Sequence, residues 1–245
     1  MKIVALIPAR LASTRFPEKP LAPILGKPMI LWVAELTAKA VGIDNTYIAT
    51  DADKIASVVE AAGFKVVMTS PDALTGTDRI AEAATQIDAD VFINVQGDEP
   101  MLDPASITKV IEAAKQHPDT VINGYAPIPQ SEDPTNVNLP KCAIASDGRL
   151  LYMSRAAVPA YKDYHKRQAV YYKQVCIYAF TRAHLEAYTS VTEKAPCEQS
   201  EDIEILRFLD LGHEVRMIEL PGDTLAVDAP GDVEMVESAM RDAGY

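Results

Sequence analysis

The chain has 245 residues, of which 48% are hydrophobic, and its 23 basic and 35 acidic side chains give a formal net charge of −12. This length suffices for one large domain or two small ones, and the acidic balance argues against general nucleic-acid binding, which needs a broad basic face. No stretch approaches the roughly 20 apolar residues of a membrane helix, so we expect neither a nucleic acid nor a membrane as partner.

Strands and helices alternate over the first half of the chain. Short apolar runs predict strands, and amphipathic stretches between Pro or capping residues and Gly predict helices. In chain order we expect a strand over 2–7, a helix over 28–41, a strand over 46–50, a helix over 52–62 capped by Asp51, a strand over 65–68, a helix near 77–87, a strand over 91–95, and a helix from Asp103-Pro104 to about His117.

Four successive strand–helix units predict a parallel sheet with helices on both faces. In such sheets ligands bind beyond the carboxyl ends of the strands. We therefore expect the loops after Ile7, Thr50 and Val95 to share one edge of the sheet and to form the ligand site.

The pattern changes after residue 120. Four β-like runs joined by Pro- and Asn-rich links predict an antiparallel, β-rich subregion near 120–180, inserted into a single domain of residues 1–245. The runs cover 120–128, 141–145, 149–154 and 172–180. Helices near 182–189 and 200–211, a strand over 214–219 and a helix from Gly231 follow. The expected fold class is α/β, with a mainly parallel sheet and an antiparallel insertion.

A basic loop follows the first strand. Arg10, Arg15 and Lys19 lie within ten residues, and Pro17 and Pro20 stiffen the loop around Lys19. The loop has neither the Gly-rich dinucleotide pattern nor that of a P-loop. Several cations and backbone amides on one loop suit a polyphosphate, whose charge must be matched on several oxygens. A solvated basic loop is the alternative.

An acidic loop follows the strand over 91–95. Gly97 allows a close backbone approach, and Asp98 is free to project toward a divalent cation. Carboxylate oxygens suit Mg²⁺, which takes one or two carboxylates together with phosphate oxygens and water. The alternative role for Asp98, a helix cap, is already filled by Asp103.

Four motifs carry a resemblance to a known family. They are P-A-R-x-x-S-x-R-x-P-x-K-P-L at 8–21, L-T-G-T-D-R-I-A-E at 74–82, N-V-Q-G-D-E-P at 94–100 and V-D-A-P-G-D at 227–232. Together and in this order they resemble the sugar nucleotidyltransferases. They are most similar to the cytidylyltransferases that activate 3-deoxy-manno-octulosonate (Kdo), an acidic eight-carbon sugar of bacterial lipopolysaccharide. The resemblance implies a Rossmann-like nucleotide-diphospho-sugar transferase fold, CTP and Kdo as substrates, Mg²⁺ as cofactor and a homodimer.

The resemblance also implies roles for individual residues at the nucleotide end. Arg10, Lys19 and Asp98 would be catalytic, with Lys19 stabilising charge in the transition state, and Asp98 and Asp228 would bind the metal. CTP would be bound by Ala9, Arg10, Ser13, Arg15, Lys19, Thr75, Gly76, Thr77 and Arg79. The alternatives are an ordinary turn with Thr77 as helix cap, a loop anchor at Arg79, and an N-cap at Asp228.

At the sugar end the resemblance implies contacts from Gln96, Arg155, Gln174, Tyr178, Glu198 and Glu201. The anomeric 2-hydroxyl of the sugar would attack the α-phosphorus of CTP, and pyrophosphate would leave. The alternatives are a surface salt bridge for Arg155 and a solvated helix start for Glu198 and Glu201.

The sugar end departs from the family pattern while the nucleotide end is standard. Gln174 stands at a family His, Cys176 at a Gly, and in the first loop Glu18 stands where Gly is usual. A neutral amide in place of a titratable ring, with Glu198 and Glu201 nearby, suits a cationic sugar substituent. We therefore hypothesise that the substrate is the 8-amino analogue of Kdo.

Three alternatives stay open on the sequence. They are a cytidylyltransferase for another acid sugar such as a sialic acid, a transferase that uses UTP or GTP, and a non-catalytic nucleotide-binding regulator. The chain begins without the pattern of a signal peptide, and Cys142, Cys176 and Cys197 lack metal-type spacing. We therefore expect reduced thiols, no structural zinc, and a cytoplasmic protein.

Overall fold

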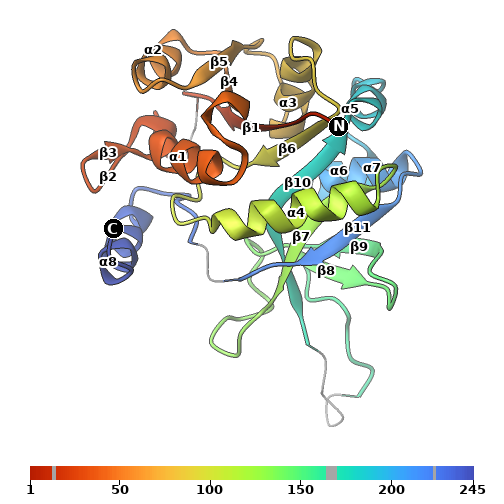
Figure 1. The fold of residues 1–245 in the computed structure, drawn as a ribbon. Helices are drawn as coiled ribbons and strands as arrows, with labels where there is room; N and C mark the ends of the chain where they lie inside the picture. The colour runs from red at the N-terminus through yellow and green to blue at the C-terminus, as the bar shows by residue number, and fades with distance from the viewer. Residues whose placement is uncertain (13–14, 164–169, 223–224) are drawn as a thin grey trace.

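The computed structural model describes residues 1–12, 15–163, 170–222 and 225–245, and its central sheet runs in the order β11-β7-β10-β6-β1-β4-β5. The predicted α/β class is confirmed (Figure 1). The first half of the chain forms β1 (Ile3–Ala9), β2 (Pro23–Ile24), β3 (Lys27–Pro28), α1 (Met29–Val41), β4 (Thr46–Thr50), α2 (Asp53–Ala61), β5 (Lys65–Met68), α3 (Gly76–Thr85), β6 (Val91–Val95) and α4 (Pro104–Gln116).

The strands β1, β4, β5 and β6 are parallel, as expected from the alternation of strands and helices. The chain proceeds from β1 outward through β4 to β5 and then returns to place β6 on the other side of β1. This reversal creates a topological switch point between β1 and β6, and the crevice beyond their carboxyl ends is where ligands bind in open α/β sheets.

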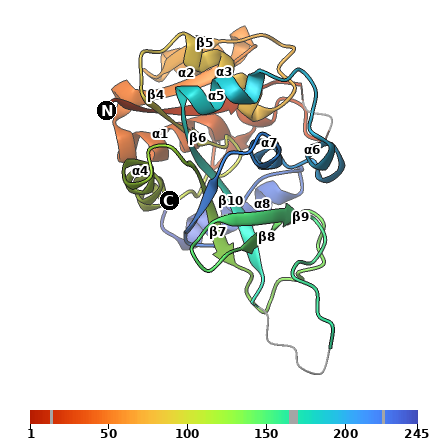
Figure 2. The same ribbon diagram turned by 90° about the vertical axis from the view of Figure 1, so that its right-hand side faces the viewer.

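Part of the β-rich region near 120–180 extends the central sheet. Strands β7 (Val121–Pro127) and β10 (Tyr172–Thr181) join the central sheet, with β10 antiparallel to both β6 and β7. The strand β11 (Val215–Glu219) pairs in parallel with β7. In the described part of this region, β8 (Lys141–Ile144) and β9 (Leu150–Ser154) lie off this path, as a hairpin beside β10 (Figure 2).

Two helix predictions needed correction. The stretch predicted as one helix over 200–211 forms α6 (Pro196–Glu201) and α7 (Ile205–Asp210), because Asp202 adopts a left-handed conformation between them. Asp51 does not cap α2, whose N-cap is Ala52; its carboxylate lies 3.6 Å from Arg79 Nη1 instead. The helices α5 (Arg182–Thr189) and α8 (Asp232–Asp242) lie where the pattern predicts them.

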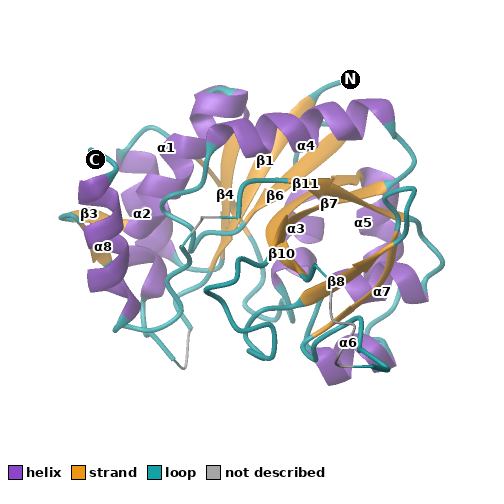
Figure 3. Cartoon of the chain, turned by 90° about the horizontal axis from the view of Figure 1, so that it is seen from below, coloured by secondary structure: helices purple, strands orange, loops and turns teal. Residues whose placement is uncertain are grey.

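The sheet has a hydrophobic core on each face. Alternation along β1 sends Val4 and Leu6 into one core and Ala5 and Ile7 into the other. The helices α1 and α4 cover one face, and α3 and α5 cover the other (Figure 3). Burial on both faces explains why these strands are continuous apolar runs rather than alternating ones.

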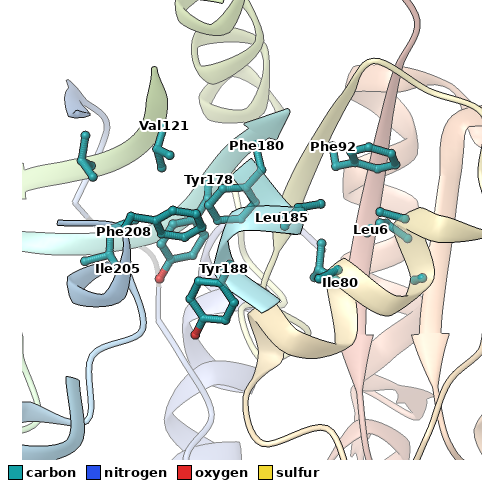
Figure 4. Packing of buried hydrophobic residues seen from close by; sticks show 14 of the residues in the cluster. Leu6, Ile80, Phe92, Val121, Tyr178, Phe180, Leu185, Tyr188, Ile205 and Phe208 are labelled. Atoms are coloured by element: carbon teal, nitrogen blue, oxygen red, sulfur yellow. The ribbon is translucent and has the colours of Figure 1, made fainter. Parts of the chain in front are cut away.

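An aromatic group fills the core under α5 and α7. The ring of Phe180 stacks on Tyr178 and Phe208, with ring centroids 5.7 and 5.1 Å apart, and Tyr188 contacts Phe208 at 5.0 Å (Figure 4). The fold therefore anchors α5 and α7 firmly to β10.

A third, smaller core holds the end of the chain. Val236 and Met240 of α8 pack with Ile24 and Met29, which places the C-terminal helix beside β2, β3 and α1 (Figure 1). This docking brings the segment around Val227, which precedes α8, next to the loop that follows β6.

His184 gives the fold a testable pH dependence. Burial lowers the pKa of His184 below its usual 6.5, and its Nδ1 accepts a hydrogen bond from Thr181 N at 3.2 Å. The imidazole of His184 therefore binds a proton more readily in the unfolded chain than in the folded one. The free energy of unfolding is at its full value above pH 6.5 and decreases as pH falls below it, by up to about 1.4 kcal/mol per pH unit. Urea unfolding should show that the free energy of unfolding changes less with pH in H184Q than in H117Q. Equal slopes of this free energy against pH in the two variants would contradict the role given to His184.

Candidate active site

A cavity of about 350 Å³ opens at the switch point between β1 and β6. Its wall comes from the loops after β1, β5 and β6, from the segment between α5 and α7, and from the segment before α8. This is the edge at which the sequence predicts the ligand site. The predicted site residues that line it are Ala9, Arg10, Arg15, Lys19, Thr75, Gly76, Arg79, Gln96, Asp98 and Asp228.

Lys19 is held between the two predicted metal ligands. Its Nζ lies 2.8 Å from Asp98 Oδ2 and 3.9 Å from Asp228 Oδ1, and it donates to Val227 O at 3.0 Å. Its side chain is only 18% exposed. The backbone of Val227 also donates to Asp98 O at 2.9 Å, so the loops after β1 and β6 and the segment before α8 meet at one ammonium.

The loop that carries Lys19 is shaped by Glu18. This residue adopts a left-handed conformation (φ 56°), which favours glycine, and its carboxylate bonds to Lys54 Nζ at 2.6 Å. The Glu18 side chain is thus paired with Lys54, which does not line the cavity. Arg10 and Arg15 are exposed, and Arg15 Nη2 lies 3.7 Å from Asp228 Oδ1. The prediction for Ser13 falls outside the described residues.

The loop after β6 approaches β1 closely. A Cβ at Gly97 would lie only 3.1 Å from Pro8 O, a tight contact that favours glycine at this position. The close approach directs Asp98 toward Lys19. Asp228 is not the helix cap, because Asp232 Oδ2 accepts hydrogen bonds from Asp228 N and Ala229 N, both at 2.8 Å. Both carboxylates therefore keep oxygens directed toward the cavity.

The donor set fits Mg²⁺ better than a metal held by protein ligands alone. Within the described ranges, no group of three or more His, Cys, Asp or Glu side chains is close enough to hold an ion. Two carboxylates, Asp98 and Asp228, face the same point at Lys19 Nζ. Mg²⁺ commonly takes one or two carboxylates and completes its octahedron with phosphate oxygens and water.

The N-terminus of α3 forms the opposite wall. Thr75, rather than Thr77, is the N-cap and accepts from Asp78 N at 3.1 Å. The amides of Gly76 and Thr77 donate to Glu204 at 3.1 and 2.8 Å, and Thr77 Oγ1 donates to the same carboxylate at 2.5 Å. Both amides are therefore already bonded to Glu204. Thr77 does not line the cavity, which argues against the predicted contact of Thr77 with CTP.

Glu204 is a cavity residue to which sequence reasoning gave no role. Burial raises the pKa of its carboxyl, while the hydrogen bonds from Thr77 and Gly76 oppose this. A carboxylate at a helix N-terminus is favoured by the helix dipole. Glu204 lies immediately before α7, and nothing in its spacing along the sequence shows that its side chain reaches α3.

Two further residues predicted for ligand binding are held by protein contacts. Arg79 is buried, donates to Thr69 Oγ1 at 2.5 Å and lies beside Asp51, which supports its role as a loop anchor. Glu198 is fully buried, and its carboxylate bonds to Arg207 Nε and Nη2 at 2.6 and 2.7 Å. This geometry gives Glu198 a role in stability rather than its predicted role in sugar binding.

Arg155 and Glu201 each form a hydrogen bond from the side chain to the backbone of the other. Glu201 accepts from Arg155 N at 2.8 Å and from Ser154 Oγ at 2.7 Å. The Arg155 guanidinium donates to three carbonyl oxygens, those of Glu201, Val137 and Asp202. Arg155 therefore ties β9 to the end of α6, and neither residue lines the described cavity.

Gln174 and Tyr178 form a polar pair within the sheet. Gln174 Nε2 donates to Tyr178 Oη at 3.1 Å and to Asn123 Oδ1 at 2.9 Å. Burial raises the pKa of both Tyr178 and the neighbouring Cys176 thiol, so both are neutral. Of the predicted sugar residues, only Gln96 lines the cavity; the sugar contacts of Gln174 and Tyr178 stay predictions.

Comparisons with known proteins agree on one family. A family model for cytidylyltransferases matches residues 4–216. The 8-amino-3,8-dideoxy-manno-octulosonate cytidylyltransferase of Shewanella oneidensis is 42% identical over 98% of this chain and 99% of its own length. The Shewanella baltica OS195 enzyme with the same activity is 40% identical over the same shares.

Solved structures give the same picture. The structure of CMP:2-keto-3-deoxy-manno-octonic acid synthetase in complex with CTP has a TM-score of 0.92 and 34% identity, covering 99% of this chain and 100% of its own. The inositol-1-phosphate CTP transferase of T. maritima has a TM-score of 0.71 over 98% of this chain and 95% of its own, and at 15% identity it shares the fold alone.

Proposed function

The chain belongs to the cytidylyltransferase family, and on that basis we propose that it transfers CMP from CTP to the anomeric hydroxyl of 8-amino-Kdo or Kdo, with release of pyrophosphate. The observation that carries the proposal is the 42% identity to an 8-amino-Kdo enzyme over nearly the full length of both chains. The cations and carboxylates at the switch point supply chemistry that fits this reaction.

In this proposal the basic loop binds the triphosphate. Arg10 and Arg15 are exposed at the cavity and pair with phosphate oxygens, which matches charge on several atoms. Lys19 Nζ stabilises the charge that develops on the α-phosphate oxygens as the acceptor oxygen attacks and pyrophosphate leaves. Its three contacts, with Asp98, Asp228 and Val227, fix its position before the substrate arrives, which favours catalysis by positioning.

Asp98 and Asp228 are the residues that would hold Mg²⁺ in this proposal. When bound, Mg²⁺ neutralises phosphate charge and polarises the phosphoryl group. The carboxylate of Asp228 is available because Asp232 makes the hydrogen bonds at the start of the following helix. Asp98 is kept in place by the close approach of Gly97 to Pro8.

Removal of either carboxylate should weaken the response to the metal. We expect D98N and D228N to need at least about tenfold more Mg²⁺ for half-maximal pyrophosphate release, since each loses one of two charged ligands. Isothermal titration of Mg²⁺ with CTP present gives a readout separate from turnover. D103N is the matched control, because Asn caps a helix as well as Asp. Equal Mg²⁺ requirements in all four proteins would contradict the ligand assignment.

The activity is tested with a matrix of substrates. The protein is incubated with Mg²⁺, each of CTP, UTP and GTP, and each of 8-amino-Kdo, Kdo and a sialic acid, and the products are identified by mass spectrometry. We expect a CMP-sugar only from CTP and an octulosonate-type sugar. A product only from sialic acid, or only from UTP or GTP, would replace the proposal. Binding of CTP with no product from any sugar would favour a non-catalytic regulator.

The remaining proposals concern the assembly and location of the protein. Within the described ranges, no helix combines the length and the apolar character needed to cross a membrane. We propose a homodimer that uses the 120–180 region, and activity in the cytoplasm, where the free thiols of Cys142, Cys176 and Cys197 stay reduced. Sedimentation equilibrium at working concentration should give twice the mass of the 26.6 kDa chain, and a monomer would contradict the dimer.

A further inference from the structure

Four carboxylates line the cavity within the described ranges: Asp98, Asp202, Glu204 and Asp228. Asp98 and Asp228 share Lys19, and Glu204 is bonded to the N-terminus of α3. The Asp202 carboxylate instead accepts a hydrogen bond at 2.7 Å from Lys194, a second lysine of the cavity wall.

We propose that Asp202 selects an acceptor sugar that carries an ammonium group, which takes the place of Lys194 at the Asp202 carboxylate. This inference rests on the proposed function and deepens it, because it names the residue that distinguishes the amino sugar from the hydroxy sugar. The acids suggested by the sequence, Glu198 and Glu201, are bonded to Arg207 and to Ser154 and Arg155, and neither lines the cavity.

The backbone holds Asp202 in a fixed and unusual conformation. Its φ and ψ are both 51°, a left-handed conformation that is costly for residues other than Gly and least so for Asn and Asp. Asp202 N donates to Glu198 O at 2.8 Å, and Asp202 O accepts from Arg155 Nη2 at 3.0 Å. Both backbone groups are therefore held, while the side chain is 74% exposed at the cavity.

The carboxylate is charged and faces cations on several elements. The hydrogen bond from Lys194 is the main cause that lowers the pKa of Asp202, and Arg155 and Arg15 lower it further. Arg15 belongs to the basic loop after β1, and Arg15 and Asp202 line the same cavity. An acceptor whose hydroxyl attacks the α-phosphorus must lie beside the phosphate end of the cavity, and Asp202 is placed to meet one of its substituents.

An exchange of ammonium groups keeps the charges matched. The side chain of Lys194 is 23% exposed, and its long flexible stem lets the ammonium leave Asp202 for water without moving the backbone. A sugar ammonium then restores an ion pair at the same carboxylate. A sugar hydroxyl either leaves Lys194 in place or forms a single hydrogen bond with Asp202. That bond is weaker than the one from an ammonium group, because hydrogen bonds between groups of opposite charge are stronger.

Two substitutions with opposite expected effects test the inference. D202N keeps the size and the left-handed preference of the residue but removes its charge. We expect kcat/KM for 8-amino-Kdo to fall about tenfold, while kcat/KM for Kdo and the KM for CTP stay within about twofold. K194M removes the competing ammonium, and we expect the KM for 8-amino-Kdo to fall about threefold, with no change for Kdo. D210N, on the exposed side of α7, is the control.

The outcomes separate this inference from the proposed function. Unchanged selectivity in D202N would overturn the inference, whether both sugars lost activity equally, as a role in the fold alone would cause, or neither did. A raised KM for 8-amino-Kdo in K194M would also overturn it, even if D202N failed to fold. A wild-type protein that prefers Kdo would overturn the inference but leave the proposed function intact, whereas no turnover of either sugar would overturn the function itself.

Discussion

Replacement of Lys19 with methionine is expected to lower kcat for CTP-dependent pyrophosphate release by about 10²–10³-fold, the scale found when a charge-stabilising donor is removed from an active site. Lys19 Nζ is bonded to Asp98 and Val227 and lies 3.9 Å from Asp228, so these contacts fix the position of its charge in the cavity. Methionine keeps most of the side-chain volume and removes only the ammonium. Steady-state kinetics at saturating CTP and sugar measure the effect on the chemical step.

Lys54 provides the matched control for this prediction. It bonds to Glu18, the neighbour of Lys19, but on the exposed outer side of the loop, with its side chain 56% exposed. K54M should therefore retain kcat within about twofold, because exposed ion pairs contribute little. If K19M kept near wild-type kcat while its thermal stability matched K54M, the assignment of Lys19 to transition-state charge would be wrong.

Loss of the buried Arg207 guanidinium should cause the largest change in stability. Arg207 is 1% exposed, bonds to Glu198 at 2.6 and 2.7 Å, and lies over the ring of Tyr188 at 3.8 Å. R207M leaves the Glu198 carboxylate buried without its partner, and we expect the free energy of unfolding to fall by about 3–5 kcal/mol. R241M, which breaks an exposed pair with Glu237, should cost less than about 0.5 kcal/mol.

A double substitution separates the charge from the packing. R207M combined with E198L removes both members of the pair, and this variant should be more stable than R207M alone because no unpaired charge stays buried. Guanidinium chloride unfolding measures both variants. A further variant, E198Q, tests whether Glu198 supports the fold rather than binding the sugar. E198Q should unfold more easily, while its KM for the sugar stays unchanged. A stable E198Q with a raised sugar KM would restore the role predicted from the sequence.

The first half of the fold could be predicted because its signals are local. The strands β4, β5 and β6 occupy the predicted residues, and α1 begins after Pro28 and ends before Gly42 as the pattern indicates. The placement of β7 and β10 could not be predicted in the same way. Their pairing with β6 and β11 joins residues far apart in the chain, and a β-like run looks the same whether it extends the main sheet or forms an insertion.

More of the residues predicted for CTP and the metal line the cavity than of those predicted for the sugar. The residues on the loops after β1 and β6 were placed at one edge because the carboxyl ends of parallel strands meet there. The contacts of Glu198 and Arg155 depend on which charged groups become buried together. Nothing in their spacing shows that Glu198 pairs with Arg207 or that Arg155 bonds to three carbonyl oxygens.

Single backbone angles account for the other misses. The helix predicted over 200–211 breaks at Asp202, and Glu18 adopts a conformation that favours glycine. Both residues are of types that occur in helices and loops alike, so composition does not distinguish their left-handed conformation. The break at Asp202 also turns Glu204 toward α3, which explains why that contact was missed.

The most direct measurement is the rate of pyrophosphate release from CTP and Mg²⁺ with 8-amino-Kdo, with Kdo and with no sugar. We expect no release without a sugar, release with either octulosonate, and a higher kcat/KM with 8-amino-Kdo. Absence of release with both sugars, at saturating CTP, would contradict the assignment of this cavity to CMP transfer onto an eight-carbon acid sugar.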